Sequence, residues 1–260
     1  MPSRLARVLV PTIVVAVLSS LTGTPSRAGE PPQAARVLDR MVAFLGGPEA
    51  VYGVRTLVVS ASARRDGEAL AVPTRTTFAF PLHVRRDFVV AGRTLALVSG
   101  PDGAQLVTRD GGVRLSASER VAFERSTMRD PVALAKARLG RGVSVELAGT
   151  DTVDGAPTDL VRLRQGGHET VLAVARDDGR LVAIRYPLDA QATMTVRFGG
   201  WAVRGRGLRY PSHARGTIDG RDAFAIEVQR IDVDPRLDPV LFAVDEGVAT
   251  FSTRAGEGLR

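Results

Sequence analysis

The sequence contains no cysteine, which excludes a disulfide framework and a zinc site built on thiolates. A chain of 260 residues without such crosslinks depends on its apolar core, and a hydrophobic fraction of 44% can supply one. Aromatic residues make up only 5%, with one tryptophan, Trp201. The sequence has no aromatic-and-basic cluster of the kind that binds single-stranded nucleic acid, so we expect no nucleic-acid partner.

Signatures of catalysis are also missing. The three histidines, His83, His168 and His213, lie far apart and form no His-x-His or His-Glu-x-x-His pair, so we expect no metal site. The sequence has no Gly-x-Ser-x-Gly nucleophile elbow and no glycine-rich phosphate loop. We therefore expect a protein that is not an enzyme and that carries no cofactor.

Two features near the end of the chain each admit two interpretations. Asp232 and Asp234 alternate on one strand and could form a carboxylate pair, but a solvated strand end with a turn at Asp234-Pro235 is the favoured interpretation. Trp201 follows Gly199-Gly200 and could stack on a ligand. Packing in the core or at its rim is the more frequent role of a single tryptophan.

The charge is basic, with a formal value of +7 and a pI of about 10.9. Such a charge favours contact with anionic surfaces, and an anionic membrane surface is therefore one candidate partner. Lys136 is the only lysine, so the basic residues are nearly all arginines. Because these arginines are spread along the chain, a coding bias explains them better than a binding patch does.

The first 28 residues have the layout of a secretory signal. Arg4 and Arg7 precede an apolar run from Val8 to Leu21, and Ser26 and Ala28 place small residues at the −3 and −1 positions of a cleavage site. The apolar run is shorter than the roughly 20 residues that span a bilayer, which argues against an uncleaved anchor. We expect cleavage after Ala28, an exported chain that begins at Gly29, and one domain over residues 29–260.

Turn signals divide the rest of the chain into short segments. Asp-Gly is a strong turn dipeptide because both residues tolerate positive φ. It occurs at residues 66–67, 102–103, 110–111, 154–155, 178–179 and 219–220.

Between these turns, apolar and polar side chains alternate with a period of two. The apolar members include Leu57 and Val59; Phe78 and Phe80; Phe88 and Val90; Val143, Val145 and Leu147; Val161 and Leu163; Met194, Val196 and Phe198; and Phe224, Ile226 and Val228. This pattern predicts strands with one dry face, and two-residue turns make neighbouring strands antiparallel. A long antiparallel meander twists and curls, and its apolar face must be covered.

Two pairs of helices are predicted to supply that cover. Residues 33–45 carry an apolar stripe, stop at Gly46-Gly47 and restart at Pro48. In the middle of the chain, Ser116 and Glu119 stand at capping-box spacing, and Asp130 caps a further helix that opens with Pro131. Its apolar face includes Met128, Val132, Ala135 and Leu139, until Gly140 ends it.

This organisation resembles the periplasmic outer-membrane lipoprotein carrier (LolA/LolB-like) superfamily. The resemblance rests on the helix ending in AFLGGPEAV (43–51), the two meanders around a helical insertion, GLRYP (207–211), and a closing IDVDP (231–235) before Leu241-Phe242. It implies an α+β fold: a half-open β-barrel, that is, a curved antiparallel sheet with helices over the concave face. In this family the hollow receives acyl chains, and the central helices would act as a lid.

The resulting expectation is a monomeric, non-enzymatic binder or carrier of a lipid or an acylated protein, located in the periplasm or extracytoplasmic envelope. The alternative is a protein-interaction or envelope-sensor module whose helices permanently fill the hollow. The residues predicted to line the hollow and lid are Phe78, Phe80, Phe88, Leu97, Phe123, Met128, Val132, Leu139, Met194, Phe198 and Phe224.

Overall fold

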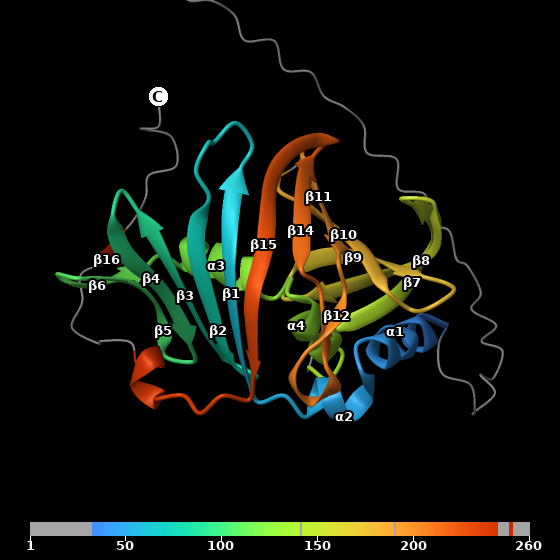
Figure 1. Ribbon diagram of the computed structural model, residues 1–260, viewed down its shortest axis with the longest axis horizontal. Helices are drawn as coiled ribbons and strands as arrows, with labels where there is room; N and C mark the ends of the chain where they lie inside the picture. Colours follow the sequence, from blue (N-terminus) through green and yellow to red (C-terminus); the bar gives the residue numbers. More distant parts are fainter. Residues whose placement is uncertain (1–32, 141, 190, 244–249, 252–260) are drawn as a thin grey trace, which may run out of the picture. The chain divides into compact units, whose positions relative to one another are not determined.

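The structure is a computed structural model that describes residues 33–140, 142–189, 191–243 and 250–251 (Figure 1). The predicted signal at residues 1–28 lies outside this range. The helices are α1 (Gln33–Phe44), α2 (Gly47–Tyr52), α3 (Ala117–Thr127) and α4 (Pro131–Ala137), with 3-10 turns η1 (Gly205–Gly207) and η2 (Pro239–Phe242). The strands of the first half are β1 (Thr56–Arg65), β2 (Val72–Ala79), β3 (His83–Val90), β4 (Arg93–Gly100), β5 (Gly103–Thr108) and β6 (Gly111–Leu115). Those of the second half are β7 (Ser144–Val153), β8 (Ala156–Gln165), β9 (His168–Ala175), β10 (Leu181–Pro187), β11 (Thr193–Gly199), β12 (Ala202–Val203), β13 (Arg209–Tyr210), β14 (His213–Ile218), β15 (Arg221–Val233) and β16 (Thr250–Phe251).

The predicted Asp-Gly turns connect strands as expected. Asp154 and Gly155 have φ values of 49° and 78° between β7 and β8, and the turn between β14 and β15 has the same positive-φ pair. Both central residues of a type I′ hairpin need positive φ, which Asp and Gly tolerate. The β3–β4 turn reaches this geometry with Ala91 and Gly92, which the dipeptide signal did not mark.

Fourteen strands form one curved, unclosed sheet in the order β16-β6-β5-β4-β3-β2-β1-β15-β14-β11-β10-β9-β8-β7, and β12 and β13 pair with each other as a separate two-stranded sheet. Neighbouring strands pair antiparallel, except β16, which runs parallel to β6. The first meander, β1 to β6, and the second, β7 to β15, meet where the long strand β15 pairs with β1. The predicted α+β fold with a half-open antiparallel barrel is thus confirmed.

This topology explains why helices stand in the middle of the chain. Strand β6 lies near one edge of the sheet and β7 forms the other edge, so the segment that joins them must cross the whole width of the sheet. Helices α3 and α4 make this crossing (Figure 1). A crossing segment of a curved sheet can bury an apolar face only on the concave side, where the strands present their dry face.

The helices divide the concave side between them. Helix α1 packs on β7, β8 and β9, helix α3 packs on β4, β5 and β6, and α4 contacts α1 and α2. The main core contains the inner residues of α1, Phe78, Val132 and the alternating apolar residues of both meanders. No helix in the described part of the chain has the length and apolarity needed to cross a membrane.

Candidate functional site

Helix α4 belongs to the core. The carboxylate of Asp130 caps it, because Oδ1 accepts hydrogen bonds from the backbone N–H groups of Val132 (2.8 Å) and Ala133 (3.2 Å). All five residues from Pro131 to Ala135 are buried, and Leu134 is only 4% exposed. Such a helix fills space between elements, and it could leave only if the core came apart.

Helix α3 is attached much less firmly. Its predicted capping box is present, since the Ser116 hydroxyl accepts from the backbone N–H of Glu119 and the Glu119 carboxylate accepts from the backbone N–H of Ser116. Only Phe123 and Thr127 are buried along its 11 residues. The helix therefore rests on the sheet through one aromatic anchor and a polar underside.

Polar contacts hold α3 to β4. The Ser99 hydroxyl donates to Glu124 Oε1 (2.7 Å), and Arg120 Nη2 donates to the carbonyl oxygen of Gly100 (3.2 Å). Each of these hydrogen bonds joins a neutral group to a charged one, and such bonds contribute about 1.5–3 kcal/mol each, so the two together hold α3 by only a few kcal/mol. An element held in this way belongs to the low-stability end of a structure.

Arg86 of β3 lies beneath α3 and reaches it from the sheet. Its Nη1 donates to the Ser126 hydroxyl (3.1 Å), its Nε donates to the Thr76 hydroxyl (3.3 Å), and its guanidinium lies 5.8 Å from the Phe123 ring centroid. Burial lowers the pKa of Arg86, although the nearby Asp130 carboxylate partly opposes this. The apolar concave face thus contains a cation whose hydrogen-bond partners are hydroxyls.

A second polar contact ties the start of α4 to β13. The Tyr210 hydroxyl donates a short hydrogen bond to Asp130 Oδ2. Burial raises the pKa of Asp130, while the hydrogen bonds from Tyr210 and from the α4 backbone oppose this rise. Burial also raises the pKa of Tyr210 well above its usual value. Together with the capping bonds, this contact fixes where α4 begins.

Most of the predicted hollow residues are brought together. Phe78, Phe123, Val132 and Met194 belong to the main core, and Phe80, Leu97, Phe198 and Phe224 are partly buried against it. The rings of Phe78 and Phe80 stack with centroids 5.4 Å apart.

The predicted apolar face over residues 128–139 does not form as one surface. Helix α3 ends at Thr127, and Met128 is its half-buried C-cap. Leu139 lies beyond the end of α4 and is 65% exposed, because the chain tightens there: the Leu139 N–H bonds to the Lys136 carbonyl, three residues back. A helical stripe needs the α-helical period to continue, and this turn interrupts it. Phe88 shares the concave face with Arg86 but is only half-buried, outside the main core.

Asp234 has a structural role, in agreement with the favoured interpretation of a turn. Its Oδ1 accepts from the backbone N–H groups of Arg55 (2.6 Å) and Thr56 (3.0 Å), and its Oδ2 accepts from Arg206 (2.6 Å). Partial burial acts to raise its pKa, but these hydrogen bonds outweigh burial and the pKa is lowered. Asp232 pairs instead with Arg230.

His168 stands beside α3 at a small hollow of about 270 Å³. The hollow is lined by Arg125, Arg129, Gly167, His168, Glu169, Pro187, Leu188 and Asp189. Arg125 Nε donates to His168 Nε2 (2.9 Å), which requires that nitrogen to be unprotonated. Burial, followed by the charges of Arg125 and Arg129, lowers the pKa of His168. Protonation of His168 would therefore break one contact between α3 and β9.

We expect a proton NMR titration to place the pKa of His168 below the ordinary histidine value of about 6.5. Because its pKa is lowered in the folded state, the stability from this contact is present above the ordinary value and is lost as pH falls through the lowered one. Arg125→Gln should raise the pKa of His168, whereas Arg93→Gln, on β4, should leave it unchanged. An unchanged pKa in Arg125→Gln would contradict the assigned contact.

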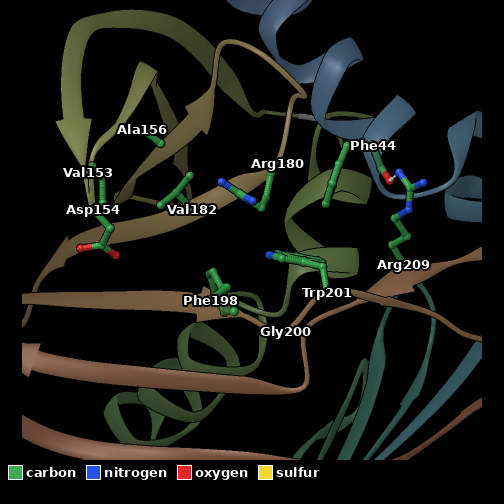
Figure 2. Close-up of a pocket in the computed structure, with 11 residues that line it drawn as sticks. Phe44, Val153, Asp154, Ala156, Arg180, Val182, Phe198, Gly200, Trp201 and Arg209 are labelled. Carbon is green, nitrogen blue, oxygen red and sulfur yellow. Dashed lines mark hydrogen bonds between the residues drawn. The ribbon is translucent and has the colours of Figure 1, made fainter.

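A larger cavity, of about 420 Å³, lies at the end of α1 (Figure 2). Its lining residues are Phe44, Val153, Asp154, Ala156, Arg180, Val182, Phe198, Gly199, Gly200, Trp201 and Arg209. They come from α1, the β7–β8 turn, the start of β10, the end of β11, the Gly200-Trp201 loop that follows it, and β13, and none belongs to α3 or to the first meander. Trp201 thus stands at a cavity wall, packed against the rim of the core.

Comparisons with known proteins show the fold. No protein-family model matches the sequence, and no curated protein matches it. Among solved structures, the chain is similar to a DUF1329 family protein from Desulfovibrio piger, with a TM-score of 0.59 and 16% identity over 82% of this chain and 98% of that one. It is also similar to a putative outer membrane lipoprotein-sorting protein domain from Vibrio parahaemolyticus (TM-score 0.57, 9% identity, 81% and 97% covered) and to a LolA superfamily protein from Nitrosomonas europaea (0.56, 12%, 81% and 97%). The chain therefore has a distant LolA/LolB-like fold.

Proposed function

We propose that this chain is an exported, non-enzymatic binder or carrier of a lipid or an acylated protein, and that the acyl chain lies beneath α3. The observation that carries the proposal is the difference between the two central helices. Helix α4 is buried in the core, whereas α3 covers the apolar face of the first meander through Phe123 and a set of polar contacts. Of the two central helices that the sequence predicts to form a lid, we therefore expect only α3 to move.

The face beneath α3 has the chemistry that an acyl chain requires. Leu97 and Ser99 lie two residues apart on β4, so their side chains point to the same face of the sheet. Because Ser99 bonds to α3, this is the face that α3 covers. Phe88 and Phe123 add aromatic surface nearby on β3 and α3. Each methylene removed from water contributes about 0.8 kcal/mol, so a long chain could offset the opening of the two partly buried hydrogen bonds between α3 and β4.

In this proposal Arg86 exchanges partners when a ligand enters. With α3 closed, the guanidinium bonds to Ser126 and lies near the Phe123 ring. If an acyl chain displaces Phe123, the guanidinium loses this partner and can turn toward a carboxylate or phosphate headgroup at the opening. A free lipid and an acylated protein would both place an acyl chain in the hollow, and they differ in the part of the ligand that stays outside it.

The proposal is tested with a fluorescent fatty acid, 11-(dansylamino)undecanoic acid, added to the purified protein. We expect saturable binding with a blue-shifted emission, because the dansyl group leaves water. Leu97→Arg should weaken the affinity about tenfold or more, because it places a second cation among apolar side chains next to Arg86. Leu147→Arg, on the outer strand β7, is the matched control and should bind as wild type.

Hydrogen exchange on the same samples locates the moving element. Amides of α3 should exchange faster than those of α4 without ligand, and the probe should change the exchange of α3 selectively. Absence of probe binding, together with equally slow exchange in α3 and α4, would contradict the carrier proposal.

That outcome would favour the second candidate, a protein-interaction or envelope-sensor module with a filled hollow. One observation supports it: Val37, Leu38 and Met41 of α1, with Leu134 of α4, already fill the concave side of the second meander. Export through residues 1–28, a location in the periplasm or extracytoplasmic envelope, a single domain over residues 29–260 and a monomeric state belong to both proposals.

A further inference from the structure

The cavity at the end of α1 is built by residues that hold one another in place. Arg209 Nη1 donates to the carbonyl oxygen of Phe44 (3.0 Å), and its guanidinium lies 5.2 Å from the Phe44 ring centroid. The Phe44 ring meets Trp201 edge to face at 5.3 Å, and Phe198 stands 6.2 Å from Trp201. The interplanar angles are 83° for Phe44 and Trp201 and 59° for Phe198 and Trp201, so the three rings line one side of the cavity with faces and edges at different angles, and an aromatic ligand could pack edge to face or face to face against them.

The loop before Trp201 is shaped by tight backbone contacts. Gly200 has a φ of +63°, and a Cβ at this position would lie 1.9 Å from the Ser212 hydroxyl oxygen. Only glycine fits such a close approach at this backbone angle. The loop therefore holds the indole against the cavity with little freedom, and no residue of α3 lines this cavity.

The indole presents an unused hydrogen-bond donor. Trp201 Nε1 is buried and has no hydrogen-bond partner among the residues that the structure describes. Figure 2 shows the nitrogen end of the indole pointing toward the side of the cavity that carries Arg180, Val182 and Phe198. A buried donor without an acceptor costs about 1–3 kcal/mol, and an acceptor atom entering from that side would remove the cost.

The charge of the lining is positive. Arg180 and Arg209 line the cavity with one carboxylate, Asp154, which lies 3.3 Å from the guanidinium of Arg197. Arg180 is 39% exposed, and its carboxylate contact, with Asp178, is long at 3.8 Å. Its guanidinium fork is thus available to a carboxylate or phosphate, the groups that it binds with two parallel hydrogen bonds.

We infer that this cavity is a second binding site, separate from the hollow under α3, for a small organic anion in which a carboxylate or phosphate is attached to an aromatic ring. The ring packs among the tilted rings of Phe44, Trp201 and Phe198, and the anionic group bonds to Arg180. An oxygen of the same group accepts the Trp201 N–H. The volume of about 420 Å³ suits a small molecule of this kind.

The chain supplies its own reporter, because Trp201 is the only tryptophan. Phenyl phosphate and benzoate are titrated into the purified protein, with Trp201 emission and calorimetry as parallel readouts. We expect saturable changes at submillimolar concentration for at least one of them. Inorganic phosphate and benzyl alcohol, which each lack one half of the ligand, should bind much more weakly.

Two variants separate a specific site from general attraction to a basic protein. Arg180→Gln should weaken the affinity about tenfold, whereas Arg93→Gln removes the same charge from β4 and should leave it unchanged. Trp201→Phe keeps a ring but removes the N–H, and calorimetry should show weaker binding. Neither Arg180→Gln nor phenyl phosphate should alter binding of the fatty-acid probe under α3, so this site and the proposed function are tested separately.

The inference is overturned if neither aryl anion gives a saturable signal, or if Arg93→Gln weakens binding as much as Arg180→Gln. It is also overturned if benzyl alcohol binds as tightly as phenyl phosphate, since Arg180 would then contribute nothing to binding. The same holds if inorganic phosphate binds as tightly as phenyl phosphate, since the aromatic rings would then contribute nothing. The Arg180 side chain is partly exposed and its contact with Asp178 is long, so Arg180→Gln is expected to fold, and an unchanged melting temperature checks this.

Discussion

Leu134→Ala is expected to lower the free energy of unfolding by about 2–5 kcal/mol, because it opens a cavity in the centre of the core. Leu134 is 4% exposed and belongs to the main core. Urea unfolding followed by circular dichroism measures the change. If α4 were part of a movable lid, the same substitution would leave the midpoint nearly unchanged.

The matched control lies five residues further along the chain. Leu139 is 65% exposed, so Leu139→Ala should change stability by less than about 0.5 kcal/mol, as surface substitutions usually do. The two variants remove the same atoms from the same segment of sequence. Their difference therefore measures how the fold divides this segment between core and surface, and equal losses would contradict the described end of α4.

Asp130→Ala is expected to cost about 2–4 kcal/mol, the sum of a lost N-cap and a buried hydroxyl left without its acceptor. The carboxylate accepts from the backbone of Val132 and Ala133 at the start of α4, and from the Tyr210 hydroxyl. Thermal and urea unfolding report the loss. Asp130→Asn keeps a capping oxygen and should lose clearly less.

Tyr210→Phe separates the two roles of Asp130. This substitution leaves the cap intact and removes only the contact between β13 and α4. In a double-mutant cycle, Asp130→Ala and Tyr210→Phe should be non-additive, because each removes the same hydrogen bond. Additive losses would mean that the Tyr210 contact contributes nothing, and that Asp130 acts as a cap alone.

Local features of the sequence were sufficient to predict most of the secondary structure. The Asp-Gly turns and the period-two alternation predicted the two antiparallel meanders, and Ser116 with Glu119, and Asp130 with Pro131, marked the starts of α3 and α4. These signals work because turns and caps depend on residues within a few positions of one another. The LolA/LolB-like fold followed from the order of these elements.

One site residue carried a signal that could have been used. Arg86 occupies the apolar phase of β3, between Val84 and Phe88, so the alternation alone places a charge on the dry face. Burying a charge on such a face costs free energy unless the charge is hydrogen-bonded or paired with an opposite charge. A charged residue in this position is therefore a candidate functional residue. Its partners, Ser126 and Thr76, come from other elements and could not be named from the pattern.

The sequence by itself determined most of the strands and turns, the starts of the central helices and the side of the sheet that is dry, because each depends on neighbours along the chain. Tertiary structure decided that α4 is core while α3 is a cover, since burial depends on which strands lie opposite and the two helices cross different parts of the sheet. It also decided the cavity at Trp201, whose wall joins Phe44 to Phe198 and Arg180. Residues so far apart meet only because the second meander folds back on α1, and no local pattern encodes that approach.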